Sequence, residues 1–473
     1  MLRSLAGISL LLGIFCTAQA EAAGIDYWVW HRATPLTDAE RAKLTAQEVK
    51  TLFWNVGEIE DRSGKWRWKV PPRALAGVAD GFRVVPVVRL TSEIRQPFAP
   101  DALAGLGAEL KSVAGEAGRV QLDFDCPDRL LAEYAAALHV LRSSVPHLAI
   151  TALAHWPRLP AFPALTREVE EIAPMFYDLQ ADPTGVSASA PPPPLLEPAQ
   201  IEAALRPWSA CPIPWRAGLP TFARLTVFDR TGLSRGQIPN WTWDDFCFHK
   251  SLHTLAPTRL GVTLFRADTD TRIAATPIAQ DELIASRFTD RAALAQSVAL
   301  ARAAGAAGVV IFRLSDGTDP SGWSPGDLGK LASPEKPRLI LRQAPGDFLE
   351  LVNDSPVDLA PRLFGEKSDR DRGYALEIDA HAPLFREALA GDFWRVASHA
   401  QPDSKKPVAV VVPLATRLTF WFSQLRAGAA LRTGLLQLAP GASLENVRYR
   451  VLHCADVAEW KPITSAPSAK TTP

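Results

Sequence analysis

Two carboxylates stand two residues apart near the end of one short β-rich run, Val120–Asp125. Successive side chains of a β-strand point to opposite faces, so Gln121, Asp123 and Asp125 would share one face. Two aspartates crowded on one face raise the pKa of one of them, which is how a general acid stays protonated near neutral pH. The run therefore predicts an acid–base pair. The alternative is a structural, hydrogen-bonded pair.

A second run, Glu171–Asp178, ends with a phenol beside a carboxylate. Tyr177 offers a hydroxyl and Asp178 a carboxylate at the point where a strand would give way to a loop. Polar groups at the carboxyl ends of parallel strands are placed to act on a common ligand. The alternative is a tyrosine near a strand end and an aspartate that opens the next loop.

Together these two segments resemble glycoside hydrolase family 18, the chitinase family and its relatives. That family carries D-x-D-x-E on its fourth strand, and this chain has Gln121-x-Asp123-x-Asp125. The family's sixth strand carries M-x-Y-D, which matches the run Met175–Asp178. The resemblance covers about residues 25–315 and implies a (β/α)8 barrel that acts on glycans.

The last β-rich run of this region, Gly308–Leu314, is similar to the family's final strand, with Phe312 where a tryptophan usually stands. The chain also resembles an exported bacterial family known as a domain of unknown function, number 3142. That family has the same Q-x-D-x-D signature on strand four. No established activity follows from that second resemblance.

The family 18 resemblance implies roles for the four motif residues. Asp125 takes the position of the proton donor, and Asp123 that of its partner, which orients the acetamido group whose carbonyl attacks the anomeric carbon. Tyr177 and Asp178 would stabilise the oxocarbenium-like centre. The family's donor is glutamate, and aspartate reaches about 1.5 Å less far. A displacement of this size can cost on the order of 100-fold in rate. A non-catalytic glycan-binding barrel or a structural envelope protein therefore remain alternatives.

Other polar and aromatic residues at expected strand ends would line the mouth of such a barrel and contact substrate. They are Trp30, His31, Glu58, Arg89, Glu93, His155 and Trp156, joined by Gln121 and Phe312 from the motifs. The structural or solvated alternative is the stronger one for any of them taken alone, and the prediction depends on their lining the mouth jointly. Four further tryptophans in polar stretches are expected at the surface: Trp66, Trp68, Trp241 and Trp243.

Neither a metal nor a cofactor is predicted. His249 and His253 have the spacing of a zinc site, but Lys250 stands where a zinc protease needs glutamate. The run Asp268–Asp270 begins like a calcium loop without its later glycine and glutamate. The chain contains no G-x-S-x-G nucleophile motif, and no G-x-G-x-x-G loop follows its first β-rich run.

The elements that must position these residues alternate between short β-rich and helical runs. Eight such alternations over about 290 residues predict a (β/α)8 barrel rather than an open sheet. The expected strands are Ile25–Trp30, Thr51–Val56, Arg83–Arg89, Arg119–Asp125, Leu148–His155, Glu171–Asp178, Ala217–Leu225 and Gly308–Leu314. The expected helices include Thr37–Glu48, Asp101–Ala114, Arg129–Ser143, Pro198–Leu205 and Asp290–Ala304.

Two stretches interrupt this alternation, and the pattern changes after them. Residues 187–198 hold four consecutive prolines and predict an extended loop, and residues 226–289 predict an inserted subdomain. From about residue 336 the chain reads as short strands without long helices, which predicts an antiparallel β-sandwich over residues 336–462. A disordered tail is expected over residues 463–473. The barrel region would then span residues 21–335.

Composition limits the class of protein. The chain has 473 residues, 47% of them hydrophobic and 22% charged, which suits a large folded core. Basic and acidic residues are equal at 51 each, so the sequence lacks the positive excess of a nucleic-acid binder. No apolar run of the expected mature chain is long enough to span a membrane.

The first twenty residues have the pattern of a secretory signal peptide. Arg3 precedes an apolar run, and Ala18-Gln19-Ala20 forms a small-x-small cleavage site. We therefore expect an exported protein, periplasmic or secreted, that begins at Glu21. Export permits disulfides among the four remaining cysteines, Cys126, Cys211, Cys247 and Cys454, but four unpaired thiols are at least as well supported.

Overall fold

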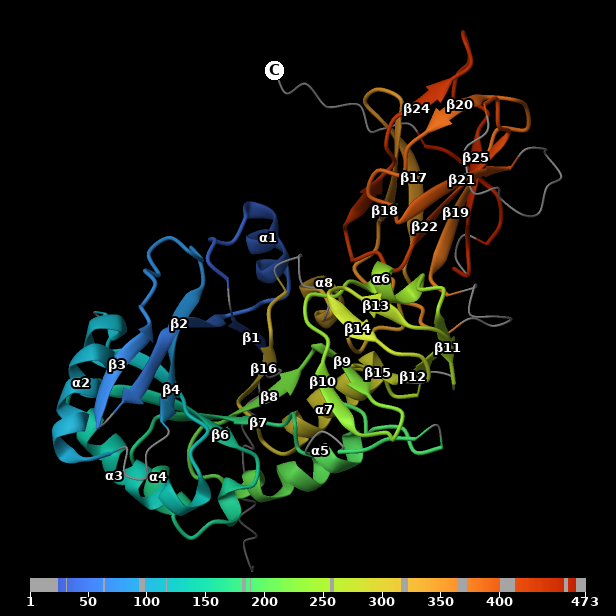
Figure 1. The fold of residues 1–473 in the computed structure, drawn as a ribbon. Helices are drawn as coiled ribbons and strands as arrows, with labels where there is room; N and C mark the ends of the chain where they lie inside the picture. The colour runs from blue at the N-terminus through green and yellow to red at the C-terminus, as the bar shows by residue number, and fades with distance from the viewer. Residues whose placement is uncertain are drawn as a thin grey trace, which may run out of the picture.

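The structure is a computed structural model with three parts: a barrel, an inserted sheet and a C-terminal pair of sheets (Figure 1). It describes residues 24–30, 32–62, 64–92, 98–115, 117–180, 184–187, 189–255, 259–315, 322–364, 372–399, 413–454 and 458–464. The expected signal peptide and two expected site residues, His31 and Glu93, lie outside these ranges.

Eight parallel strands form a closed barrel, because β1 pairs with both β2 and β16. In chain order the barrel strands are β1 (Ile25–Val29), β2 (Thr51–Arg62), β4 (Arg83–Ser92), β5 (Arg119–Asp123), β6 (His147–Leu153), β7 (Glu171–Met175), β8 (Arg216–Pro220) and β16 (Gly308–Phe312). All eight expected strands are present, and the predicted (β/α)8 barrel is confirmed. A ninth strand, β3 (Lys65–Val70), extends β2 as an antiparallel hairpin.

Helices cover the outside of the barrel. They are α1 (Asp38–Ala46), α2 (Pro100–Ala114), α3 (Leu131–Leu141), α4 (Phe162–Leu165), α5 (Pro198–Leu205), α7 (Arg291–Ala303) and α8 (Pro325–Leu328), with the short 3-10 helices η1 (Asp128–Leu130), η2 (Trp156–Arg158) and η3 (Arg206–Ala210). Thr37 caps α1 in a reciprocal capping box with Glu40, and Asp290 caps α7. These polar caps fix where the two helices begin.

The seventh expected strand, Ala217–Leu225, is two strands in the structure, so that prediction is wrong in its second half. The barrel strand β8 ends at Pro220, and β9 (Ala223–Phe228) pairs antiparallel with β15 (Leu283–Phe288) in a separate sheet. Proline lacks the N–H that would continue the ladder, and the chain leaves the barrel there. The inserted sheet therefore begins at residue 223, not at 226.

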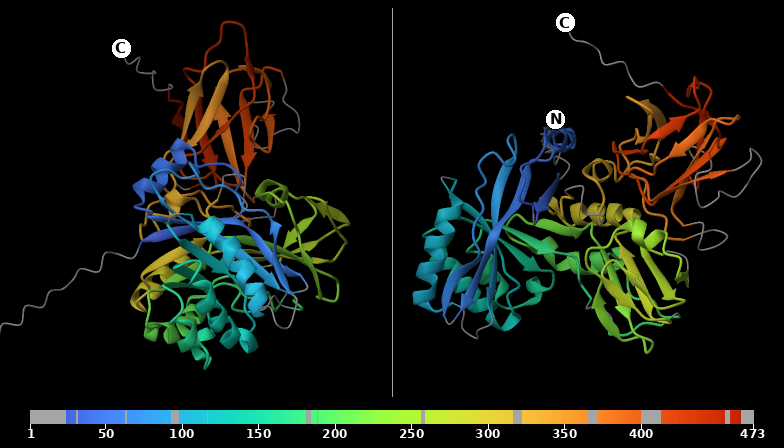
Figure 2. Two further views of the ribbon diagram at one scale, coloured as in Figure 1. Left: turned by 90° about the vertical axis from the view of Figure 1, so that its left-hand side faces the viewer. Right: turned by 45° about the horizontal axis from the view of Figure 1, so that its top comes forward.

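The inserted sheet has the order β10-β9-β15-β12-β11. Its other elements are β10 (Ser234–Gln237), α6 (Trp243–Cys247), β11 (Leu252–Thr254), β12 (Val262–Ala267) and the hairpin of β13 (Thr271–Ile273) and β14 (Thr276–Ile278). In both views of Figure 2 it lies beside the barrel and next to the C-terminal sheets. It encloses a core of its own that includes Trp243, Phe246 and Phe265.

The C-terminal part is a β-sandwich, as predicted. One sheet consists of β17 (Leu339–Ala344), β18 (Phe348–Asn353) and β23 (Ala430–Arg432). The other consists of β21 (Arg395–His399), β22 (Arg417–Phe422), β19 (Tyr374–Asp379), β25 (Arg448–Leu452) and β26 (Lys461–Pro462), and β20 (Phe385–Ala388) pairs with β24 (Leu436–Leu438). Leu341 and Leu351 of the first sheet share one core with Leu376 and Phe420 of the second.

The sandwich is joined to the barrel through a buried carboxylate. Asp358 accepts hydrogen bonds from the backbone N–H and the hydroxyl of Ser324 at 2.7 and 2.6 Å and from the backbone N–H of Ala427 at 2.7 Å. Its own N–H donates to Asp327 of α8 at 2.8 Å. Hydrogen bonds to buried charges are among the stronger ones, so this contact fixes how the sandwich sits on the barrel.

Three of the four tryptophans expected at the surface are buried, so that prediction is wrong for them. Trp66 is 5% exposed, and Trp241 and Trp243 are 8% and 1% exposed and in ring contact with each other at 4.6 Å. Trp68 is partly buried, and its Nε1 donates to Glu109 of α2 at 2.7 Å. The polar residues between these tryptophans lie on the opposite strand face or in turns, so the sequence around them looks like a surface loop.

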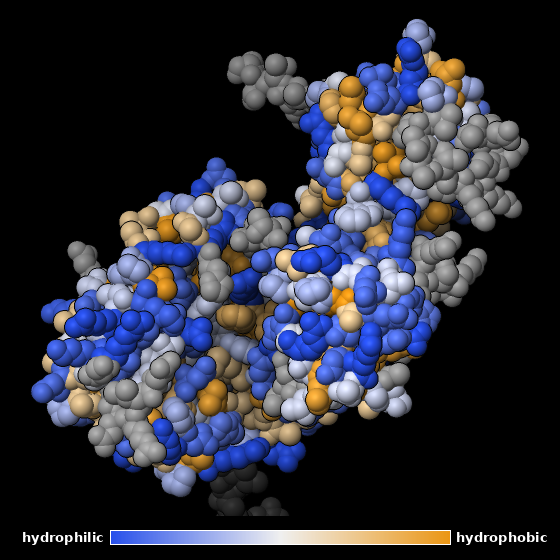
Figure 3. Space-filling model, in the orientation of Figure 1, coloured by the Kyte–Doolittle hydropathy of each residue, from blue (hydrophilic) through white to orange (hydrophobic). Residues whose placement is uncertain are grey.

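The four cysteines outside the first twenty residues form no disulfide in the part of the chain that the structure describes. No described helix is long and apolar enough to cross a membrane. Hydrophilic side chains cover most of the face shown in Figure 3, with a hollow between the barrel and the inserted sheet.

Candidate active site

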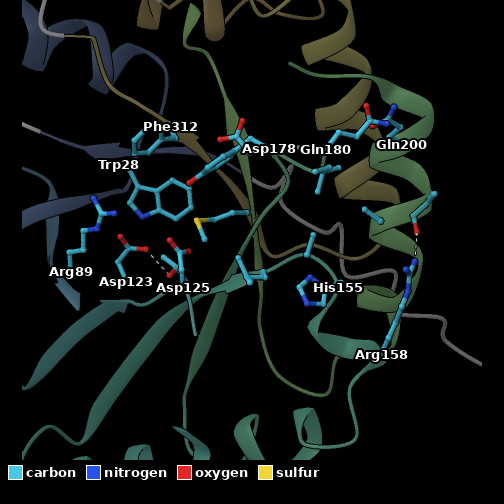
Figure 4. A pocket seen from close by; sticks show the side chains of 18 of the residues that line it. Trp28, Arg89, Asp123, Asp125, His155, Arg158, Asp178, Gln180, Gln200 and Phe312 are labelled. Atoms are coloured by element: carbon cyan, nitrogen blue, oxygen red, sulfur yellow. Dashed lines mark hydrogen bonds between the residues drawn. The ribbon is translucent and has the colours of Figure 1, made fainter. Parts of the chain in front are cut away.

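A cavity of about 730 Å³ opens at the carboxyl ends of the barrel strands. Its walls come from six of the eight strands and from the loops that follow them (Figure 4). The lining residues are Trp28, Trp30, Arg89, Asp123, Asp125, Thr151, Leu153, Ala154, His155, Arg158, Met175, Tyr177, Asp178, Leu179, Gln180, Gln200, Ala203, Ala204 and Phe312. This end of a (β/α)8 barrel is where such proteins carry their active sites.

The two aspartates of the fourth strand meet at this cavity, but they differ in their surroundings. β5 ends at Asp123, which is partly buried and accepts a hydrogen bond from the Thr151 hydroxyl at 2.8 Å. Burial, and then the nearby charge of Asp125, raise the pKa of Asp123 to about 6. The Thr151 hydrogen bond and the charge of Arg89 act in the opposite direction. Asp125 lies two residues beyond the strand and is exposed to the cavity.

The raised pKa is that of Asp123, a point that the sequence pattern left open because it predicted only that one member of the pair would have a raised pKa. Both residues line the cavity, but the strand ends between them, and only Asp123 is held among barrel side chains. Desolvation disfavours the charged form of a carboxyl group, so the more buried member of the pair takes the proton first.

Aromatic rings form one wall of the cavity. The rings of Tyr177 and Phe312 are stacked with centroids 5.6 Å apart, and Trp30 meets Phe312 edge-on at 5.7 Å. Burial, together with the charges of Asp123 and other nearby carboxylates, raises the pKa of Tyr177, so its phenol stays protonated and can donate a hydrogen bond. The wall is apolar at its face and carries one hydroxyl at its edge.

Asp178 also lines the cavity, but its charge is compensated. Its Oδ1 lies 3.0 Å from Nη1 of Arg224, a residue of the inserted strand β9. The guanidinium of Arg224 in turn lies 5.3 Å from the ring centroid of Phe222. The insertion thus supplies the counter-charge that holds the second motif carboxylate in place.

Gln121, expected to contact substrate, lies inside the barrel below the cavity. It is fully buried, and its Oε1 accepts a hydrogen bond from Nε1 of Trp28 at 2.7 Å. Gly218 on β8 makes room for the Trp28 ring, because a Cβ there would come within 2.7 Å of it. Gln121 therefore positions a ring that lines the cavity floor and does not reach the cavity itself.

Two more expected site residues lie away from the cavity walls. Glu58 pairs with Lys69 at 3.1 Å and accepts a hydrogen bond from the Thr91 hydroxyl at 3.2 Å. Trp156 begins η2 and is fully buried against Tyr134 in the barrel core. The chain turns into η2 directly after His155, so the tryptophan points inward while His155 lines the cavity and pairs with Asp128 at 2.7 Å.

The described part of the chain has no group of three or more His, Cys, Asp or Glu side chains that could hold a metal ion. The expected proline loop leaves the large cavity open. Its described residues Pro193, Pro194, Leu195 and Glu197 line only a small side pocket of about 20 Å³ beside α5.

Residues 80–232 match a family model. The family is described as a domain of unknown function (DUF3142), and the match confirms that part of the resemblance expected from the sequence. The matched segment runs from β4 into the inserted sheet and so contains both motifs, Asp123 with Asp125 and Tyr177 with Asp178. No curated protein matches this sequence.

Solved structures with a similar fold are named as chitinases. The C-terminal domain of a Desulfitobacterium hafniense protein described as a chitinase is 15% identical, with a TM-score of 0.48, covering 66% of this chain and 98% of that one. A chitinase from Chromobacterium violaceum is 14% identical, with a TM-score of 0.44 and coverages of 62% and 94%. A class V chitinase from Nicotiana tobaccum is 11% identical, with a TM-score of 0.41 and the same coverages. At these identities the likeness concerns the fold alone.

Some cavity residues were not predicted from the sequence. Thr151 lies beside Asp123 on the neighbouring strand β6. Arg158, Gln180 and Gln200 line the part of the cavity that extends toward α5. Arg158 stands three residues after His155 in the same strand-end loop, so a search of each loop beyond its first two residues would have found it. Gln200 lies within a helix, where no sequence signal separates it from an ordinary surface residue.

Proposed function

We propose that this protein is an exported glycoside hydrolase that cleaves a polysaccharide or an amino-sugar glycan. The observation that carries the proposal is the Asp123–Asp125 pair in a cavity of about 730 Å³, with the pKa of Asp123 raised to about 6. A carboxylic acid that keeps its proton up to about pH 6, beside a second carboxylate, is what acid-catalysed cleavage of a glycosidic bond requires.

In this mechanism the pair holds one proton between its two members. Asp125, the more exposed of the two, delivers that proton to the glycosidic oxygen as the bond to the anomeric carbon breaks. Asp123 stores the proton in the free protein and takes the position of the substrate-orienting residue. Water then enters to complete the hydrolysis, and its proton returns to the pair.

The remaining cavity residues have roles in binding and in stabilising charge. The Tyr177 hydroxyl donates a hydrogen bond next to the anomeric centre, and in an amino-sugar substrate its partner would be the attacking acetamido oxygen. The Asp178 carboxylate supports the positive charge that develops on the sugar ring. The rings of Trp30 and Phe312 offer apolar faces against which the C–H faces of a sugar can pack.

The test is a hydrolysis and glycan-array screen on the chain that begins at Glu21, with Asp125→Asn as the variant. Loss of a general acid costs at least on the order of 100-fold in rate. We expect that loss with glycan binding retained, because asparagine keeps the shape of the side chain. Asp80→Asn, an exposed carboxylate away from the cavity, is the matched control and should leave the rate unchanged.

Turnover that persists in Asp125→Asn would contradict the assignment of the donor. Binding without any turnover in the unmodified protein would instead favour a non-catalytic glycan-binding barrel. Export is tested separately, by N-terminal sequencing of the protein from the periplasm or the medium. A chain that begins at Glu21 supports export, and an intact Met1 contradicts it.

A further inference from the structure

Two arginines on the cavity wall have no counter-ion among the residues that the structure describes. Arg89 of β4 and Arg158 of η2 both line the cavity and are exposed, and neither lies within ion-pair distance of a described carboxylate. Arg224, by contrast, forms an ion pair with Asp178 of the cavity wall. The two free guanidinium groups are thus a feature of the cavity rather than of the whole barrel mouth.

These two arginines stand on opposite sides of the aspartate pair. In Figure 4, Asp123 and Asp125 lie between Arg89 and Arg158. Arg89 also lines a second cavity of about 180 Å³, whose walls include Asp123 and Asp125 as well. The carboxylates therefore stand at the junction of two hollows, and a chain molecule lying across them would meet one arginine on each side.

Arg158 is held loosely toward the helix beside the cavity. One of its N–H groups donates to the carbonyl oxygen of Ala203 on α5 at 3.5 Å, which is a long hydrogen bond. A guanidinium carries five N–H donors, so most of its hydrogen-bonding capacity remains for a ligand. The amide side chains of Gln180 and Gln200 line the same part of the cavity.

Below about pH 6 the charges of the described cavity residues sum to a positive value. Arg224 offsets Asp178, and Asp123, whose pKa is raised to about 6, is protonated in that range. That leaves Asp125 as the uncompensated carboxylate, against the two guanidinium groups of Arg89 and Arg158. A neutral sugar chain would gain nothing from two guanidinium groups without ion-pair partners, whereas a chain carrying negative groups would be attracted into the cavity.

We propose that the ligand of this cavity is a glycan that carries carboxylate groups, with acidic sugar units bound by Arg89 on one side of Asp125 and by Arg158 on the other. The inference names the substrate class of the hydrolase proposed above and rests on that function only for cleavage. Arginine suits this role because its planar fork matches a carboxylate with two parallel hydrogen bonds.

The experiment compares ligands that differ only in charge. Hyaluronan fragments and oligogalacturonates of four to six sugars are prepared both as free acids and as methyl esters. Each is titrated calorimetrically into the Asp125→Asn protein, in which the substitution blocks cleavage. We expect the free acids to bind at least about tenfold more tightly than their esters, with the preference shrinking as salt is added. Arg158→Gln and Arg89→Gln should each weaken binding of the acids by about tenfold, the range of one charged hydrogen bond.

Arg206→Gln is the matched control, because Arg206 is exposed in η3 and does not line the cavity. It should leave the affinity for the acids unchanged. The inference is overturned if acids and esters bind equally, if neither binds, or if Arg158→Gln binds the acids as tightly as its parent. The unmodified protein separates the two proposals: acids that bind but are not cleaved contradict the hydrolase alone, and neutral chitin oligosaccharides cleaved as fast as the acids contradict the ligand class alone.

Discussion

The two ends of the barrel carry buried carboxylates in opposite arrangements. At the amino end, Asp26 of β1 accepts hydrogen bonds from the backbone N–H groups of Lys50 and Thr51 at 3.1 and 2.8 Å. Arg216, the first residue of β8, reaches Asp26 at 2.8 Å and Glu171 of β7 at 3.0 Å. Every charge of this network has an opposite partner.

At the carboxyl end, Asp123 shares the cavity with a second carboxylate, Asp125. Burial, and then the charge of Asp125, raise the pKa of Asp123, while the charge of Arg89 acts in the opposite direction. Burial raises the pKa of Asp26 as well, so a raised pKa does not by itself distinguish the two ends. The difference is access, because Asp26 is 2% exposed among its partners whereas Asp123 opens on a large cavity. Unbalanced charge next to open space marks the functional end.

The largest expected effect is on stability at the amino end. Arg216→Met removes the cation from a buried pair and leaves Asp26 uncompensated, which costs about 3–5 kcal/mol in the free energy of unfolding. Chemical denaturation at pH 7 measures it. Arg119→Met breaks a surface pair with Glu170 and should cost less than about 1 kcal/mol. A similar loss in both variants would remove the contrast between a structural network and a surface pair.

The second prediction is that Asp123→Asn stabilises the protein at pH 7, whereas Arg216→Met destabilises it. The folded protein holds a proton on Asp123 up to a pKa of about 6, while the reference value is 3.8. Stability is therefore lost as the pH rises from about 4 through 6, because the folded state must give up a proton that it binds more tightly. Replacing this carboxyl with an amide should stabilise the protein by up to about 3 kcal/mol at pH 7.

The gain in the free energy of unfolding from Asp123→Asn should vanish below about pH 4, where the Asp123 carboxyl group is protonated in both the folded and the unfolded state. Denaturation curves from pH 3.5 to 7.5 test the pH dependence. Asp26→Asn is the sharpest contrast, since it loses an ion pair and should destabilise the protein although the pKa of Asp26 is also raised. If Asp123→Asn destabilises the protein at pH 7, the two ends do not differ in the proposed way.

The third prediction is a pH profile of hydrolysis. If the Asp123–Asp125 pair donates the proton, the rate should fall about tenfold per pH unit above about pH 6, as the pair loses that proton. The value belongs to the coupled pair rather than to one residue. Initial rates between pH 4 and 9 would show it. A rate that stays flat to pH 8 would exclude this pair as the source of the proton.

The smallest expected effect is a loss of stability from a substitution inside the barrel, between its two ends. Trp28→Phe keeps an aromatic ring in place but removes the Nε1–H that donates to Oε1 of Gln121 at 2.7 Å. The buried amide oxygen of Gln121 is then left without this donor. The cost should be about 1–2 kcal/mol in stability. Trp30→Phe, at the cavity wall and not in this hydrogen bond, is the comparison. A smaller loss in Trp28→Phe than in Trp30→Phe would mean that the hydrogen bond does not matter.

The sequence by itself determined the order of the elements in both large parts of the molecule. Alternating β-rich and helical runs predicted all eight barrel strands, and Thr37 and Asp290 marked the starts of two helices. In the sandwich, Leu418, Phe420 and Phe422 alternate with Arg417, Thr419 and Trp421, a period of two that predicts a strand, and the structure has a strand over the same residues. Local periodicity and polar caps suffice here because backbone hydrogen bonds and one buried face dictate them.

The tertiary structure decided what the local pattern could not. It raised the pKa of Asp123, because depth below the surface sets the desolvation of each carboxyl group. It buried Trp156, Trp241 and Trp243 in the core, and it brought Arg89 of β4 and Arg158 of η2 to the same cavity. Burial and the distance between charges depend on segments far apart in the chain, so residue type and spacing name the chemistry at a strand end while packing decides which group performs it.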